Sequence, residues 1–387
     1  MARVTVLNSA RDDADASALG ASAPARDDAG ASARGGASAS ARDASANAHR
    51  GAHRSPARAW VTGVVLVGVL VASIAAAVTI GPADIRVPDV VGSVLSRVGL
   101  GSTPLSELRD GIVWELRMPR VLTAAAVGAG LAISGAVMQA LTRNSLADPY
   151  LLGLSSGASL GAVAVLLLGV SLLLPVAAFA GAVAALSATL VIAGRSLSPS
   201  RTILAGVAVS SLFAALTSLL IFWTATGDSF REIINWLLGS LAGARWPAVA
   251  ISLGAILVVG VPMMMAGRAL DAFAFGDTSA ASLGVNVART RWVMLTATAL
   301  LTGAMVAVSG AIGFVGLVLP HAVRLVVGVG HRALLPLSAL TGAIFLIWCD
   351  TAARSLFDPR ELPVGIVTAI LGTPVFVALL LRARSRA

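Results

Sequence analysis

Lysine is absent from this sequence of 387 residues. Its basic side chains are 28 arginines and four histidines. A phosphate-binding P-loop needs a lysine directly after its glycine-rich turn to reach the nucleotide phosphates. The chain therefore carries no standard nucleotide site, and we expect no ATPase domain within it.

Cysteine and histidine are almost as scarce. Cys349 is the single cysteine and lies in an apolar run, so one chain can form neither a disulfide framework nor a cysteine metal site. The histidines show no metal-ligand spacing with carboxylates. Asp350 is the one acid near the interior of an apolar run, and we expect it to cap a helix end or to pair with Arg354. We predict no metal site, no cofactor held by this chain and no enzymatic activity of its own.

Charged residues make up only 12% of the sequence, whereas 57% of the residues are hydrophobic and the mean hydropathy is +0.88. This composition leaves too little polar surface to cover a soluble globule, so membrane lipid must supply the missing solvent. The net charge of +9 does not indicate nucleic-acid binding, because the arginines cluster beside apolar runs, a pattern typical of membrane topology.

Ten apolar runs fit the length of about 20 residues that a helix needs to cross a bilayer. They are residues 60–80, 119–141, 150–170, 172–194, 202–225, 247–267, 291–310, 312–329, 333–352 and 363–381. The pattern predicts an all-α integral membrane protein with ten transmembrane helices within residues 59–387. Nearly sixty residues precede the first run, unlike a cleaved leader, so we interpret that run as an anchor and residues 1–58 as a disordered cytoplasmic extension.

The arginines also predict an orientation. If the N-terminus is cytoplasmic, the inner loops from residue 50 onward hold fourteen arginines against three carboxylates, whereas the outer loops are nearly balanced. This positive-inside bias places both termini in the cytoplasm. Two segments on the outer side, Arg86 to Arg120 and Asp228 to Gly243, are too polar to span, and we expect surface helices there.

Glycine, alanine and serine fill the predicted spans. Small residues let helix backbones approach closely in a bilayer, so tight packing is the simplest interpretation. Clusters that combine small size with hydroxyl groups fit a second interpretation, a path that must not grip its cargo. The candidates for lining such a path are Ser155, Ser156, Gly157 and Ser159, together with Met138 and Gln139 of the preceding run.

Several strings resemble the permease family that imports iron-siderophores, haem and vitamin B12. The likeness runs in order over roughly residues 60 to 385. The strings that carry it are Arg117 to Arg120, Ile133 to Gln139, Arg143 to Pro149, Leu152 to Ala158, Gly310 to His321 and Glu361 to Ala369.

The resemblance implies the permease subunit of a type II ABC importer in the bacterial inner membrane. Such a subunit forms a homodimer, works with two cytoplasmic ATPase subunits that bind ATP and Mg²⁺, and receives a periplasmic substrate-binding protein. Arg117, Arg120 and Arg354 resemble outer-face arginines that dock the binding protein, with ordinary interfacial or intrachain salt bridging as the alternative interpretation. In the cytoplasmic loop 268–291, a segment resembles the coupling helix that contacts the ATPase: Ala280, Ser282, Leu283, Gly284, Val285 and Asn286.

The cargo stays open at the level of sequence. Haem or a ferric siderophore leads, and vitamin B12 is the runner-up. Gly239 to Gly243 resembles the iron and haem members, and Thr373 to Phe376 resembles the vitamin B12 members, so neither string decides the cargo. An ion-coupled secondary transporter is a less favoured alternative, because it would need intramembrane acids or repeated broken helices. A membrane enzyme would need a nucleophile, base or metal set that this chain hardly supplies.

Overall fold

The structure is a computed structural model that describes residues 56–384 apart from gaps at 82, 84, 98, 101–104, 171–172, 195–197, 225–226, 329 and 358–359. The predicted extension 1–58 therefore falls almost wholly outside the described residues. Every regular element in the described ranges is helical. The first half comprises α2 (Pro56–Thr79), α3 (Val87–Arg97), α4 (Glu107–Gly111), η1 (Ile112–Arg117), α5 (Met118–Thr142), η2 (Pro149–Leu152), α6 (Leu154–Leu167), α7 (Leu174–Ala193) and α8 (Pro199–Thr224). The second half comprises α9 (Gly227–Leu237), α10 (Trp246–Ala255), η4 (Ile256–Gly260), α11 (Val261–Met265), α12 (Gly267–Phe273), α13 (Asp277–Ser282), α14 (Val287–Ser309), α15 (Val315–Val327), α16 (His331–Ser355) and α17 (Val364–Arg384).

Each of the ten predicted spans coincides with a helical stretch. Seven stretches of the described chain are long and apolar enough to cross a membrane: Ala57–Thr79, Glu107–Thr142, Leu174–Ala193, Pro199–Thr224, Trp246–Met265, Val287–Ser309 and His331–Ser355. The other three are shorter apolar helices, α6, α15 and the apolar part of α17. The chain is therefore an all-helical, multi-pass membrane protein, and the predicted total of ten spans depends on the three short helices.

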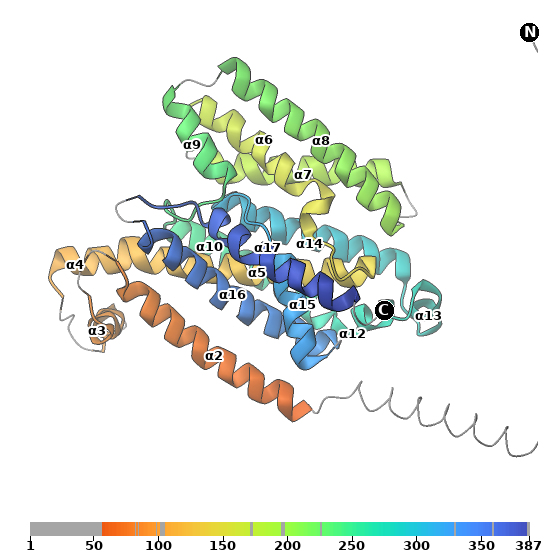
Figure 1. The fold of residues 1–387 in the computed structure, drawn as a ribbon, viewed down its shortest axis with the longest axis horizontal. Helices are drawn as coiled ribbons and strands as arrows, with labels where there is room; N and C mark the ends of the chain where they lie inside the picture. Colours follow the sequence, from red (N-terminus) through yellow and green to blue (C-terminus); the bar gives the residue numbers. More distant parts are fainter. Residues whose placement is uncertain are drawn as a thin grey trace, which may run out of the picture. The chain divides into compact units, whose positions relative to one another are not determined.

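Helix α5 lies at the centre of the described bundle (Figure 1). It packs against α16, α14, α15 and α10, and most of its side chains are buried. Helix α2 packs along α16, while α6, α7 and α8 pack on one another, and α6 and α7 contact α14. Continuous helix from residue 107 to 142 includes the π-helical turn η1 where α4 runs into α5.

Glycines set the closest helix contacts. A Cβ atom added to Gly128 of α5 would overlap the carbonyl oxygen of Gly342 in α16, and the reverse substitution would overlap the carbonyl of Gly128. Gly157 of α6 and Gly181 of α7 form a second reciprocal contact of this kind. These pairs support the packing interpretation of the small residues, because they let two backbones touch.

The two polar segments predicted as surface helices are helical, as α3 and α4 in the first segment and α9 in the second. These elements lie at one end of the long helices, and α12 and α13 lie at the opposite end (Figure 1). The bundle therefore has two distinct ends, one with an arginine cluster and one with an exposed loop.

Candidate functional site

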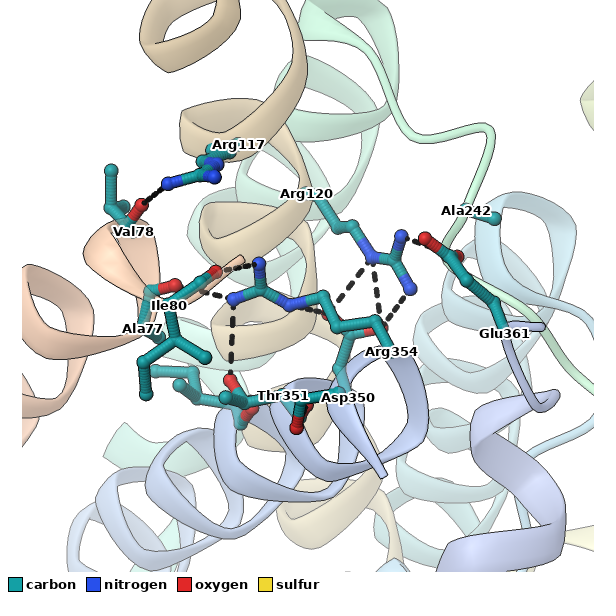
Figure 2. Close-up of polar contacts among 12 residues, drawn as sticks. Ala77, Val78, Ile80, Arg117, Arg120, Ala242, Asp350, Thr351, Arg354 and Glu361 are labelled. Atoms are coloured by element: carbon teal, nitrogen blue, oxygen red, sulfur yellow. Dashed lines mark hydrogen bonds and ion pairs between the residues drawn. The ribbon is translucent and has the colours of Figure 1, made fainter. Parts of the chain in front are cut away.

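The arginine cluster begins where α2 ends. Arg117 donates from Nη1 to the carbonyl oxygens of Val78 (2.9 Å) and Thr79 (3.0 Å). Arg354 of α16 reaches the same helix end and donates from Nη1 to Ile80 at 2.7 Å. Arg117 also donates to the carbonyl oxygen of Ala83. Arg354 also donates to the carbonyl oxygen of Ala77 (Figure 2). The last carbonyls of a helix lack intrahelical partners and favour cations, so the two arginines cap α2.

Arg120 forms the second part of the cluster. Its Nε and Nη2 atoms donate to the Asp350 carboxylate at 2.9 and 3.0 Å, and its Nη1 donates to Glu361 at 2.8 Å (Figure 2). Asp350 is 1% exposed, and Arg354 lies 3.8 Å from it. This network joins α5, α16 and the segment before α17 through a buried bidentate ion pair.

A pocket of about 480 Å³ opens beside this cluster. Arg117, Arg120, Arg354 and Glu361 line it together with Arg245, which is exposed just before α10. Four guanidinium groups against one carboxylate make the pocket electropositive, so its chemistry suits an acidic side chain.

The structure brings together all three arginines that the sequence singles out for docking. All three are mostly buried, with exposed fractions between 6 and 11%. Each guanidinium group donates hydrogen bonds to acceptors of its own chain. The intrachain role that the sequence left open is thus present, whereas docking stays a prediction. Sequence reasoning missed Arg245 and the pairing of Asp350 with Arg120, because no local pattern links residues 230 positions apart.

The opposite end presents the predicted coupling segment. Ala280 of α13 is buried, while Ser282, Leu283, Gly284 and Asn286 are exposed and Val285 is half-buried. The exposed fraction of Leu283 is 68%, and that of the nearby Phe275 is 75%. These two large apolar side chains are thus exposed on either side of α13, and exposed apolar side chains of this size are candidates for contact with a partner protein.

Three interactions hold this segment in place. The Asn286 side chain accepts a hydrogen bond from the Arg289 backbone N–H (3.0 Å) and caps α14. Arg291 pairs with Asp277 of α13 at 2.8 Å and stacks over the Phe273 ring at 5.4 Å. These contacts attach α13 and the end of α12 to the first turn of α14.

The predicted pathway residues are largely packed inside the single chain. Met138 and Gln139 are buried; the Gln139 amide donates to the Leu317 carbonyl at 3.0 Å and its oxygen accepts from Arg324 at 3.1 Å. Gly157 and Ser159 are buried, whereas Ser155 and Ser156 are half-buried. In one chain, Gln139 and Gly157 act in helix packing, and their place along a pathway stays a prediction.

The loop between α5 and η2 adds an ionisable group. Asp148 accepts a hydrogen bond from the Tyr150 N–H (2.8 Å), and desolvation of its half-buried carboxyl raises its pKa to about 6. The Tyr150 hydroxyl donates to the Ile312 carbonyl at 3.0 Å and accepts from the Ile312 N–H at 3.1 Å. The chain's single tyrosine thus ties this loop to the segment before α15.

The chain is similar to known transport proteins over most of its length. Residues 68–382 match the model of the FecCD transport family. The chain is 43% identical over 324 residues to the ABC transporter permease protein YvrB of Bacillus subtilis, covering 81% of this chain and 91% of YvrB. It is 44% identical over 282 residues to the vitamin B12 import system permease protein BtuC of Vibrio cholerae, covering 72% of this chain and 85% of BtuC. An inward-facing structure of a metal-chelate type ABC transporter superposes with a TM-score of 0.75 at 32% identity, covering 83% of this chain and 98% of that one.

Proposed function

The chain belongs to the FecCD transport family of type II ABC importer permeases, and from this premise we propose that it forms the membrane pathway for a large metal chelate. A separate ATPase subunit with bound ATP and Mg²⁺ supplies the energy. The observation that carries the proposal is the exposed segment with Leu283, which is fixed to α14 by Asn286 and Arg291. A short, tethered helix of this kind can convert closure of an ATPase into movement of the bundle.

We further propose ten spans with both termini in the cytoplasm of a bacterial cell, and two copies of the chain around one pathway in the inner membrane. Support comes from the agreement of ten apolar runs with ten helical stretches. The arginine bias independently assigns the α12–α13 end to the cytoplasm. That end is also the one with the exposed apolar loop, where an ATPase would bind.

Vitamin B12 is the first candidate cargo, because the relative at 44% identity that covers 72% of this chain is a vitamin B12 permease. This order reverses the ranking from sequence strings, in which haem or a ferric siderophore led. The iron chelates are the second candidate, supported by the 32% identical transporter of the metal-chelate type. Either cargo is large and needs weakly binding walls, which suits a chain rich in small residues.

At the opposite end, we propose that the arginine-lined pocket receives an acidic side chain of a substrate-binding protein. Arg245 is the exposed cation of this pocket, whereas Arg117, Arg120 and Arg354 are mostly occupied within the chain. Charges at the rim of an interface mainly steer association and fix its register. Arg245 therefore makes the first contact in this proposal.

Reconstitution in proteoliposomes with the partner ATPase and binding protein tests the function. We expect ATP-dependent uptake of cyanocobalamin, compared in parallel with haem and a ferric siderophore. Leu283→Asp should uncouple ATP hydrolysis from uptake, because it places a charge on the apolar surface. Leu108→Asp, a matched control with 77% exposure at the other end of the bundle, should retain coupling. Uptake driven by an ion gradient without ATP would contradict the proposal.

A further inference from the structure

An apolar groove of about 500 Å³ runs between α2 and α16. All its lining side chains are apolar; those from α2 include Trp60, Gly63 and Val67, and those from α16 include Pro336 and Leu340. The volume lies in the range of sites that bury an apolar molecule of moderate size. On a membrane protein, a groove on the flank of an outer helix is open to acyl chains.

Two arginines stand at one end of the groove. Arg58 precedes the lining residue Ala59 on α2, and Arg332 precedes the lining residue Ala333 on α16. Both arginines are exposed. Both helices begin at this end, so their N-terminal dipoles add to the positive potential. Two arginines therefore adjoin this end of the groove, while the length of the groove is apolar.

One neighbouring carboxylate, Asp271, interacts electrostatically with Arg332 as well as with His331, so it offsets part of the positive charge at this end. Asp271 of α12 accepts hydrogen bonds from the His331 backbone N–H (2.8 Å) and lies 2.7 Å from its Nδ1 atom. These bonds engage one carboxylate oxygen with His331. Trp60 follows Arg58 by two residues on α2 and has 77% of its surface exposed, as an aromatic residue at the boundary of lipid and water does.

We propose that this groove is a specific site for an anionic phospholipid. One acyl chain lies along α2 and α16, and the phosphate of the headgroup lies between Arg58 and Arg332. The charge pattern selects this occupant, because basic pockets between transmembrane helices bind anionic headgroups, whereas the ammonium group of phosphatidylcholine offsets the charge of its own phosphate. Such a lipid fastens α2 to the bundle, where the apolar flank of α2 is otherwise widely exposed.

Fluorescence quenching of Trp60 tests the proposal. The full chain and its Trp60→Phe variant are reconstituted in vesicles of phosphatidylcholine that contain brominated phosphatidylglycerol or brominated phosphatidylcholine. The difference between the two proteins isolates the Trp60 signal. We expect brominated phosphatidylglycerol to quench it at a several-fold lower mole fraction. Arg58→Gln and Arg332→Gln should each lower this preference about fivefold, while Arg201→Gln, an exposed arginine on α8, should not change it.

Val64→Phe keeps both arginines but fills the groove that Val64 lines, and should weaken quenching by phosphatidylglycerol. Equal quenching by the two brominated lipids would overturn the proposal. So would displacement of the brominated lipid by soluble glycerol phosphate at the same concentration, which would indicate a headgroup site alone. Protection of Trp60 from both lipids would assign the groove to a second copy of the chain and likewise overturn it.

Discussion

At the scale of single residues, the arginines near the end of α2 act mainly within their own chain. Arg117 and Arg354 satisfy carbonyl groups that a helix end leaves without partners, and Arg120 neutralises Asp350 in the bundle. A buried carboxylate is tolerated only with such a partner. The cluster that the family resemblance assigns to docking therefore also stabilises the fold.

Asp350→Asn should destabilise the protein strongly, because it leaves the buried Arg120 without its bidentate partner. Breaking a buried ion pair on one side costs about 3–5 kcal/mol. The thermal unfolding midpoint in detergent measures the loss. Glu361→Gln is the matched control: its carboxylate is 46% exposed, so its removal should cost at most about 1 kcal/mol. Equal losses for both variants would contradict the assignment of Asp350 as the central partner.

The raised pKa of Asp148 predicts that the stability of the folded protein depends on pH. The pKa of its carboxyl is about 6 in the folded protein against an ordinary value of 3.8, so the folded state holds the proton more tightly. This contribution to stability is present below pH 4 and is lost as the pH rises to about 6. Asp148→Asn keeps an acceptor for the Tyr150 N–H and removes the charge. We expect the variant to gain thermal stability over the natural protein at pH 7.5 but not at pH 4; a pH-independent difference would count against it.

At the scale of helices, contacts between glycines set which elements lie together. The α5–α16 and α6–α7 pairs touch through Gly128 with Gly342 and Gly157 with Gly181. Without a hydrophobic driving force between helices in lipid, such close contacts supply much of the attraction. The position of Asp350 beside Arg120 depends on the same α5–α16 packing.

Gly128→Val should separate α5 from α16, because its side chain would overlap the Gly342 carbonyl. Overpacking typically costs about 1–3 kcal/mol, and overlap with a backbone carbonyl puts this variant at the upper end of that range. Thermal unfolding in detergent and yield of folded protein measure the effect. Gly68→Val on α2 is the control, since a Cβ there meets nothing within 4 Å and should change stability by less than about 1 kcal/mol. Similar losses in the two variants would rule out the packing explanation.

At the scale of the whole molecule, the scarcity of cysteine makes the topology measurable. Cys349→Ala removes the single thiol, which is buried. On that background, Leu283→Cys and Leu108→Cys place exposed thiols at opposite ends of the bundle. We expect a membrane-impermeant maleimide to label position 108 on spheroplasts and position 283 only after permeabilisation. The reverse pattern would invert the proposed orientation.

The amino-acid sequence alone determined the class of the protein and the location of ten apolar helical stretches. It also determined that the loops at one end of these stretches are richer in arginine than those at the other end. These properties follow from local composition, because twenty apolar residues and flanking arginines act within one segment. Tertiary structure decided that Arg120 pairs with Asp350, that Gln139 packs against α15 and that α2 and α16 enclose a groove. The Arg120–Asp350 pair alone joins residues 230 positions apart, and apolar segments of similar composition carry no local signal of which neighbour they will meet.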